Sequence, residues 1–340
     1  MSGHFAYLDT ETIPSQDPAI IGEIGSRYPV ADVDVDDVKP AANLVDPPKI
    51  EADIAKKRAK LIEDREAALA KAEAARDKDY RDLSKHGGAG AHLACISYAI
   101  DGEPVQCFRN EALAKFDGRY SVPTFEEVLE GEREMLRTFF VNLRFSITDA
   151  WANRALAAWD ELEAKADQSG FVDIGGGYVR KLPSAGRDAW IEENRRRFSV
   201  LPAIVAHFAE FDVRLVWQRA KILGVTPPVW WPIDYHRYKT DEVVDTMAMW
   251  AGHGGRISLD NLCKSLGVPG KDNLDGSMVW DAIQQGRLLE VGTCCDDDVE
   301  RVRRVHKILR RDHHQVDDQL FEAAAAAADR DHGVAQEEVA

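Results

Sequence analysis

Near its N-terminus the chain reads Tyr7-Leu8-Asp9-Thr10-Glu11-Thr12, directly after a short apolar run. We expect a β-strand over residues 4–10. Because side chains alternate across a strand, Asp9 and Glu11 then point to the same side. Two neighbouring carboxylates repel each other unless a cation lies between them, and hard cations such as Mg²⁺ prefer oxygen ligands. The alternative interpretation is a strand end or turn with two solvated acids.

A third acid, Asp212, directly follows the stretch Ala206-His207-Phe208-Ala209-Glu210-Phe211. We expect Asp212 to open a helix that runs from Val213 to Leu223 and ends at Gly224, since glycine commonly terminates helices. At helical spacing, Asp212 falls on the same face as the apolar residues of this helix. An N-cap role is the alternative, because Asp is a preferred cap residue, and both interpretations can hold together.

A fourth acid, Asp298, begins the apolar face of a helix near the C-terminus. Val302, Val305 and Leu309 follow it at steps of four, three and four residues. A carboxylate on the buried side of a helix is costly unless it is paired or bound to a metal. The two acids that precede it fall on other faces and are interpreted as first-turn charges favoured by the helix dipole. The alternative is that Asp298 is one more first-turn acid.

Taken together, the four acids resemble the pattern of the DEDD superfamily of 3′–5′ exonucleases, the DnaQ-like group with a ribonuclease-H-like fold. The order agrees, with an Asp-x-Glu strand early, Phe-Asp in mid-chain and an acid on a late helix. Further stretches are similar to a branch of predicted exonucleases related to the proofreading domain of family B polymerases, and to prophage-encoded members especially. These stretches are residues 204–212, 257–262, 266–271 and 294–299. In all, the resemblance covers about residues 4–16, 85–145 and 200–312.

The resemblance implies an α/β fold, namely a ribonuclease-H-like mixed five-stranded sheet flanked by helices, with helical insertions. It also implies a metal-dependent 3′–5′ exonuclease that uses two divalent cations, Mg²⁺ or Mn²⁺. Asp9, Glu11 and Asp298 would hold one cation, Asp9 would bridge to the second, and Asp212 would bind largely through water. Such a site stabilises both the attacking and the leaving oxygen of a phosphodiester. The implied substrate is a nucleic-acid 3′ end, single-stranded or frayed, with DNA favoured over RNA, and the implied products are nucleoside 5′-monophosphates.

Two positions depart from the family pattern. The tyrosine subgroup places Tyr four residues before the last Asp, and the histidine subgroup places His five residues before it. Here those positions hold Cys294 and Thr293. The general base is therefore unassigned, and the candidates for that base or for orienting water are Cys294, His207, Tyr235, His236 and Tyr238. In the second motif, the position after His207 often holds Asn, whereas here it holds Phe208.

A thiol matches the role of a tyrosine poorly, so a second function stays open. This is a catalytically weakened DEDD relative that binds nucleic-acid ends or a replication or recombination partner. A structure-specific endonuclease or RNase on the same fold is a third interpretation. Metal-dependent turnover separates the first two, and a panel of substrates tests the third.

Aromatic and basic residues alternate between residues 230 and 239. Stacking of an aromatic ring on a base is worth about 1–3 kcal/mol and tolerates any sequence, so this stretch would suit a frayed 3′ end. The candidates for contact with the substrate are Thr10, Phe211, Trp231 and Tyr238. Packing in the core and in loops is the alternative for the aromatic residues.

The composition predicts a cytoplasmic enzyme. The 340 residues carry a net charge of −16, which does not favour sequence-independent binding to nucleic acid through phosphate neutralisation. This charge argues against a protein that coats duplexes, but not against an enzyme that grips a few terminal nucleotides. The five cysteines stand in no metal-ligand spacing, and we expect them to be reduced thiols. No apolar run approaches the length of about 20 residues that spans a membrane, and there is no signal-peptide pattern.

We expect one exonuclease domain over residues 1–320 with two insertions. The first, at about residues 33–86, is rich in Ala, Lys and Glu and is expected to be helical. The second lies at about residues 147–198. Either insertion is a candidate site for a protein partner, and the first is also a candidate arm for DNA, with a solvated helical insertion as the alternative. The Ala-rich acidic tail, residues 321–340, is expected to be disordered.

Overall fold

The computed structural model describes most of the chain between residues 4 and 310. The described residues are 4–30, 34–117, 122–166, 168, 170–175, 178–182, 186–233, 242–252, 254–270 and 274–310. The expected disordered tail at 321–340 therefore lies outside the described residues.

Five strands form the central sheet, in the order β3-β2-β1-β6-β7. Their bounds are β1 Phe5–Pro14, β2 Ala91–Ile100, β3 Gln106–Arg109, β6 Ala203–Ala206 and β7 Val243–Asp245. Strands β1, β2 and β3 pair antiparallel, whereas β6 pairs parallel with both β1 and β7. This mixed five-stranded sheet, flanked by helices, is the ribonuclease-H-like fold that the sequence predicts.

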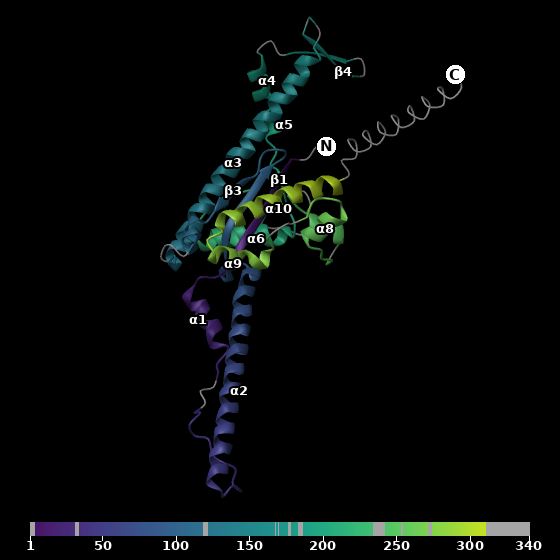
Figure 1. Cartoon of the computed structure of the whole chain (residues 1–340). Coiled ribbons are helices and arrows are strands. Elements are labelled where there is room, and N and C mark those ends of the chain that lie inside the picture. The colour runs from purple at the N-terminus through teal and green to yellow at the C-terminus, as the bar shows by residue number, and fades with distance from the viewer. Residues whose placement is uncertain are drawn as a thin grey trace, which may run out of the picture.

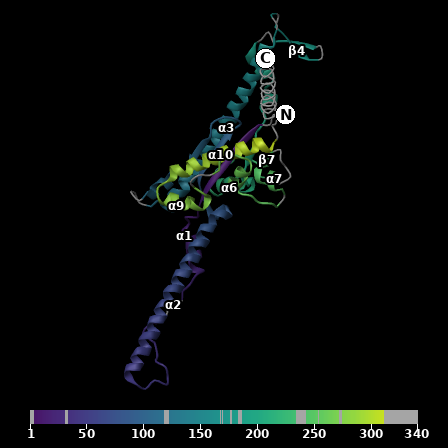
Figure 2. The same cartoon turned by 45° about the vertical axis from the view of Figure 1, so that its right-hand side comes forward.

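Helices cover both faces of the sheet (Figures 1 and 2). The longer ones are α1 Pro18–Ser26, α2 Pro47–Asp82, α3 Phe125–Ala164, α6 Ala209–Ile222 and α10 Leu288–Leu309. The shorter ones are α4 Arg187–Glu193, α5 Arg195–Phe198, α7 Thr246–Ala251, α8 Leu259–Ser265 and α9 Val279–Gln284. Four 3₁₀ turns, η1 Leu83–His86, η2 Gly88–Gly90, η3 Glu111–Asp117 and η4 Gly276–Met278, and the hairpin β4 Phe171–Gly175 with β5 Tyr178–Lys181 complete the described elements.

The core has a separate layer on each side of β1. Leu8 faces a cluster with Leu136 and Phe139 of α3 and Val216 of α6. Tyr7, its neighbour on the strand, faces the opposite cluster with residues of α10. This alternation is the period of two that a strand imposes, and it fixes which residues of β1 face α10.

Two helices begin earlier than the sequence predicts. Helix α6 starts at Ala209, so Asp212 is neither its first residue nor its N-cap; the cap position is Phe208, in the left-handed conformation with φ 63°. Helix α10 starts at Leu288, ten residues before Asp298, so the acids next to Asp298 are not first-turn charges. The reason is that the apolar face of α10 continues toward its N-terminus beyond Asp298, through the buried residues Cys295, Val291 and Leu288.

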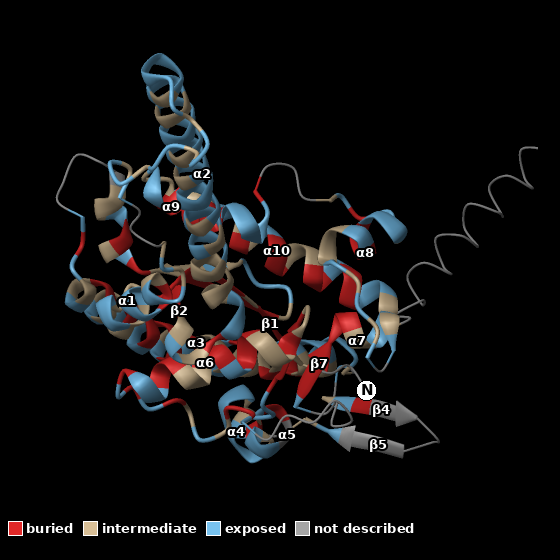
Figure 3. Cartoon of the chain, turned by 90° about the horizontal axis from the view of Figure 1, so that it is seen from below, coloured by how far each residue is buried: buried red, intermediate tan, exposed pale blue. Residues whose placement is uncertain are grey.

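The first predicted insertion contains the long helix α2, which projects from the body (Figure 1). Opposite charges four residues apart support it, such as Asp53 with Lys57 and Asp77 with Arg81, and none of its residues is buried (Figure 3). In the second, α3 continues without a break beyond the core, and Trp159, Trp190 and Phe198 form a separate small cluster. Whether these segments are insertions in an otherwise single domain stays a prediction. Among the described residues, no helix combines the length and apolar composition that crossing a membrane requires.

Candidate metal centre

Three carboxylates from two elements converge at the face of β1 that packs on α10. Asp9 and Glu11 stand on this face because they occupy alternate positions of β1, and Asp298 lies on the buried side of α10. One carboxylate oxygen from each residue lies within 4.8 Å of the oxygens of the other two. The structure therefore brings together three of the four acids that the sequence singles out.

The fourth acid, Asp212, approaches from α6 on the other side of the strand. Thr10 points to that side, and its hydroxyl donates a hydrogen bond of 2.6 Å to Asp212 Oδ1. Asp212 is buried, and burial raises its pKa to about 7, with the nearby charges of Glu11 and Asp245 adding to the effect. Asp212 thus adjoins the centre formed by the other three acids, and Thr10 fixes its side chain.

The carboxylates of this centre lie so close together that the others disfavour the ionised form of Asp9. Burial raises the pKa of Asp9 well above its ordinary value, and the charges of Asp212, Asp298 and Glu11 raise it further. Arg301, one turn after Asp298 on α10, forms an ion pair with Asp298 Oδ1. The donor set is entirely carboxylate oxygen, which fits a hard divalent cation such as Mg²⁺ or Mn²⁺.

A cysteine that the sequence reasoning missed contacts this centre. Cys295 is fully buried, and its thiol lies 3.4 Å from the backbone oxygen of Asp9 and 3.3 Å from Asp9 Oδ2. Cys294, the predicted candidate, is half-buried and packs against an apolar cluster that includes Ile13 and Val291. The spacing of the buried residues on α10 would have selected Cys295, which stands three residues before Asp298.

His207 is held by hydrogen bonds at both ring nitrogens. Its Nε2–H donates to the carbonyl oxygen of Ile257 at 2.9 Å, and its Nδ1 lies 3.0 Å from the hydroxyl of Thr246. Burial lowers the pKa of this imidazole and so favours its neutral form, although the bond to Ile257 acts in the opposite direction. Both ring nitrogens of His207 are thus engaged in hydrogen bonds, and its role as a general base stays a prediction. The other predicted candidates, Tyr235, His236 and Tyr238, lie outside the described residues.

The expectation that Trp231 contacts the substrate is wrong. Its side chain is only 3% exposed, and its Nε1–H donates to the carbonyl oxygen of Val213 at 3.1 Å. The ring packs edge-on against Phe139 and Phe140 in the core between α3 and α6. Core packing, the alternative interpretation of this aromatic stretch, therefore holds for Trp231.

Phe211, by contrast, lines an open cavity of about 720 Å³ together with Thr10 and Glu11. A second aromatic residue, Phe208, lines the same cavity, and the two rings are parallel within 9° with centroids 6.3 Å apart. The Phe208 backbone N–H donates to Asp245 Oδ1 at 3.0 Å, which holds the turn before α6. The sequence did not single out Phe208 for contact with a ligand.

The C-terminal part of the chain, residues 198–324, matches a family described as a predicted 3′–5′ exonuclease related to the exonuclease domain of PolB. This match confirms the resemblance to the DEDD exonucleases. The matched segment contains Asp212 and Asp298, while Asp9 and Glu11 precede it in the chain. The chain is thus similar to a family of nucleases, enzymes that hydrolyse nucleic acids. The likeness to prophage-encoded members stays a prediction. No curated protein and no solved structure matches the chain.

Proposed function

We propose that the protein is a metal-dependent 3′–5′ exonuclease that hydrolyses phosphodiester bonds at nucleic-acid 3′ ends, with DNA preferred over RNA. The observation that carries this proposal is the approach of Asp9, Glu11 and Asp298 to within 4.8 Å of one another, in a chain similar to predicted exonucleases. Three carboxylates at this separation in a partly buried site strongly favour a bound cation over mutual repulsion.

The residues that would hold two divalent cations are Asp9, Glu11 and Asp298, with Asp212 acting largely through water. Bound Mg²⁺ or Mn²⁺ would lower the pKa of the attacking water and neutralise charge on the leaving 3′ oxygen, so that nucleoside 5′-monophosphates are released. The chain itself supplies rigid positioning of these acids. Thr10 orients Asp212, and the Cys295 thiol orients Asp9.

The alternative function is a catalytically weakened DEDD relative that binds nucleic-acid ends or a protein partner of replication or recombination. The observation that favours it is Cys294 at the position of the water-orienting tyrosine. The candidates for that role remain Cys294, His207, Tyr235, His236 and Tyr238. Because the carboxylates are complete, we place the exonuclease first.

The deciding experiment digests 5′-labelled single-stranded DNA and RNA in Mg²⁺, Mn²⁺ or EDTA. We expect a metal-dependent ladder that shortens from the 3′ end, faster on DNA. Asp9→Ala and Asp298→Asn should lower the rate by more than about a hundredfold, beyond the effect typical of groups that only support a metal ligand. Asp297→Asn is the matched control, because Asp297 is exposed on the same helix turn and should retain activity. Binding without cleavage in any metal would favour the alternative.

A further inference from the structure

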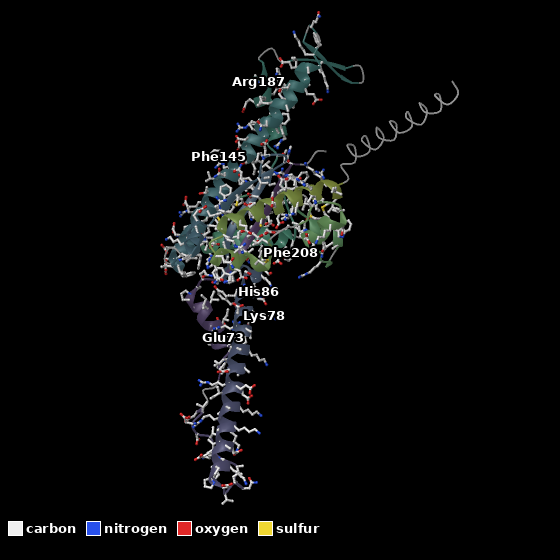
Figure 4. All side chains as sticks on the ribbon, in the orientation of Figure 1. Glu73, Lys78, His86, Phe145, Arg187 and Phe208 are labelled. Atoms are coloured by element: carbon white, nitrogen blue, oxygen red, sulfur yellow. The ribbon has the colours of Figure 1, made fainter. Side chains whose placement is uncertain are left out.

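The open cavity beside the acidic centre is lined on one side by α2. One wall comes from Thr10 and Glu11 of β1 with Phe208 and Phe211, and the other includes Lys78 of α2. Figure 4 labels Lys78 and His86 where α2 reaches the body, with Glu73 farther out along the helix. Because Glu11 belongs to both the centre and the cavity, any occupant of this cavity lies against the acids.

The wall formed by α2 and the following turn η1 carries three cations and two acids, because Lys85 of η1 adds to the balanced charges of α2. Its cations Lys78, Arg81 and Lys85 stand beside two acids, Asp77 and Asp82. Arg81 is fixed by ion pairs of 2.8 Å to both Asp77 and Asp281, and Lys85 pairs with Asp82 at 2.6 Å.

Lys78 differs from these two cations because it forms no ion pair within 4.0 Å with another described residue, and like Lys85 it is exposed. In a chain of net charge −16, a cation that lines a cavity without a carboxylate within ion-pair distance favours the binding of an anion there.

The inner wall offers aromatic rings. The rings of Phe208 and Phe211 both line this cavity and are parallel within 9°, and the Arg256 guanidinium lies 5.8 Å from the centroid of the Phe208 ring. Bases stack on such rings without regard to sequence. A cavity of about 720 Å³ is in the size range of small-ligand sites, so it accepts a few nucleotides of one strand rather than a duplex.

We propose that the last turns of α2 form the outer wall of a groove for single-stranded nucleic acid, in which Lys78 binds a backbone phosphate while bases stack on Phe208 and Phe211. The occupant is a single strand because the cavity combines a phosphate-binding cation with base-stacking rings next to phosphodiester chemistry. This inference rests on the proposed function only for the direction of the strand, whose 3′ end enters at the acids. It makes α2 part of the substrate site.

The test compares Lys78→Glu with Lys71→Glu. Lys71 lies seven residues earlier, about 10.5 Å farther from the body on nearly the same face of α2, and does not line the cavity. Both residues are exposed, and unchanged melting temperatures would exclude damage to the fold. Fluorescence anisotropy measures the binding of labelled ten-nucleotide DNA and RNA strands, with Asp9→Asn present in every protein to prevent cleavage.

We expect Lys78→Glu to raise Kd about tenfold for both DNA and RNA and to reduce the salt dependence of binding by about one counterion or more, because a phosphate contact is lost. Lys71→Glu should bind like its parent. Equal binding by both variants, or equal losses in both, would overturn the inference.

The same variants, without Asp9→Asn, separate this inference from the proposed function. If the wild-type protein shortens strands and Lys78→Glu shortens them with the same KM, the groove is wrong and the exonuclease stands. If no protein cleaves but binding depends on Lys78 and not on Lys71, the exonuclease is wrong and the groove stands.

Discussion

The thiol of Cys295 lies 3.3 Å from the carboxylate oxygen Oδ2 of Asp9, and so links α10 directly to an acid of the centre that β1 supplies. The same thiol lies 3.4 Å from the backbone oxygen of Asp9. Because Cys295 and Asp298 occupy the same buried face of α10, the helix that supplies one acid also positions another. The packing of α10 against β1 therefore sets part of the geometry of the centre.

Replacing Cys295 with alanine should lower the affinity for a divalent cation more than it lowers the free energy of unfolding. The variant loses a donor to Asp9, and a hydrogen bond of this kind is worth about 1 kcal/mol, equivalent to about a fivefold change in affinity. Cys295→Ser keeps a donor and should restore most of the affinity. A Mn²⁺ titration followed by melting temperature measures this without relying on turnover. Equal affinities of the alanine variant and the wild type would contradict a positioning role for the thiol.

The metal-free protein should become more stable when one acid of the centre is neutralised. Burial and the neighbouring acids raise the pKa of Asp9, which means that its ionised form destabilises the folded state at pH values above the ordinary carboxyl pKa of 3.8. In EDTA, Asp9→Asn should raise Tm by about 2–4 °C, the shift that about 1 kcal/mol produces in a domain of ordinary size. In Mn²⁺ the wild type should gain stability and the variant should gain little. A lower Tm for the variant in EDTA would count against crowding of charge at this site.

The clustering of Asp9, Glu11 and Asp298 could be predicted because each of these acids carries a local signal. Asp9 and Glu11 follow from the alternation of a strand, and Asp298 from its place on an apolar helix face. The sheet order, by contrast, came from the resemblance, because pairings between distant segments such as β1 and β6 leave no periodic pattern.

What the sequence did not reveal depends on tertiary contacts. The choice between Cys294 and Cys295 required knowing that α10 starts at Leu288, which extends its buried face past the acids. The burial of Trp231 depends on α3 and α6 meeting over its ring, and an alternation of aromatic and basic residues cannot distinguish such packing from a binding surface. Local composition therefore misassigned this residue.

A buried ionic network behind the sheet should control stability and its dependence on pH. Glu132 of α3 accepts bonds from His92 at 2.9 Å and from Arg219 Nε and Nη2 at 2.7 Å each. Burial opposes the charged form of Glu132, but the bonds from His92 and Arg219 outweigh it and lower its pKa. Glu132→Gln leaves Arg219 without its counter-ion and should cost about 3–5 kcal/mol of unfolding free energy at pH 7.

The sign of the pH effect follows from the lowered pKa. Glu132 contributes its stability above the ordinary carboxyl pKa of 4.5, and this contribution is lost as the pH falls through the lower folded value. Urea titrations should therefore find the gap between wild type and Glu132→Gln widest at neutral pH and narrower below pH 4.5. Glu134→Gln, an exposed acid on the same helix, is the control and should change little at any pH. A gap that widens on acidification would exclude this assignment.

Phe208 combines backbone strain with a position at the cavity that we propose binds single-stranded nucleic acid, so its replacement should separate stability from binding. Its φ of 63° is a left-handed conformation that costs a bulky residue about 1–2 kcal/mol, and Asn, the residue often found here in similar exonucleases, tolerates it better. Phe208→Asn should therefore raise the unfolding free energy by about 1 kcal/mol, provided that the loss of ring packing is small.

The same variant removes a stacking surface and should weaken the binding of single-stranded DNA by about fivefold or more, since each stacked base contributes about 1–3 kcal/mol. Phe211→Leu tests the ring alone, because Phe211 lies within α6 and its backbone is not strained. It should weaken binding without any gain in stability. Urea unfolding and anisotropy on the same preparations measure both quantities. A Phe208→Asn protein that is more stable and binds DNA as tightly as the wild type would mean that the strained turn serves another purpose than stacking on a base.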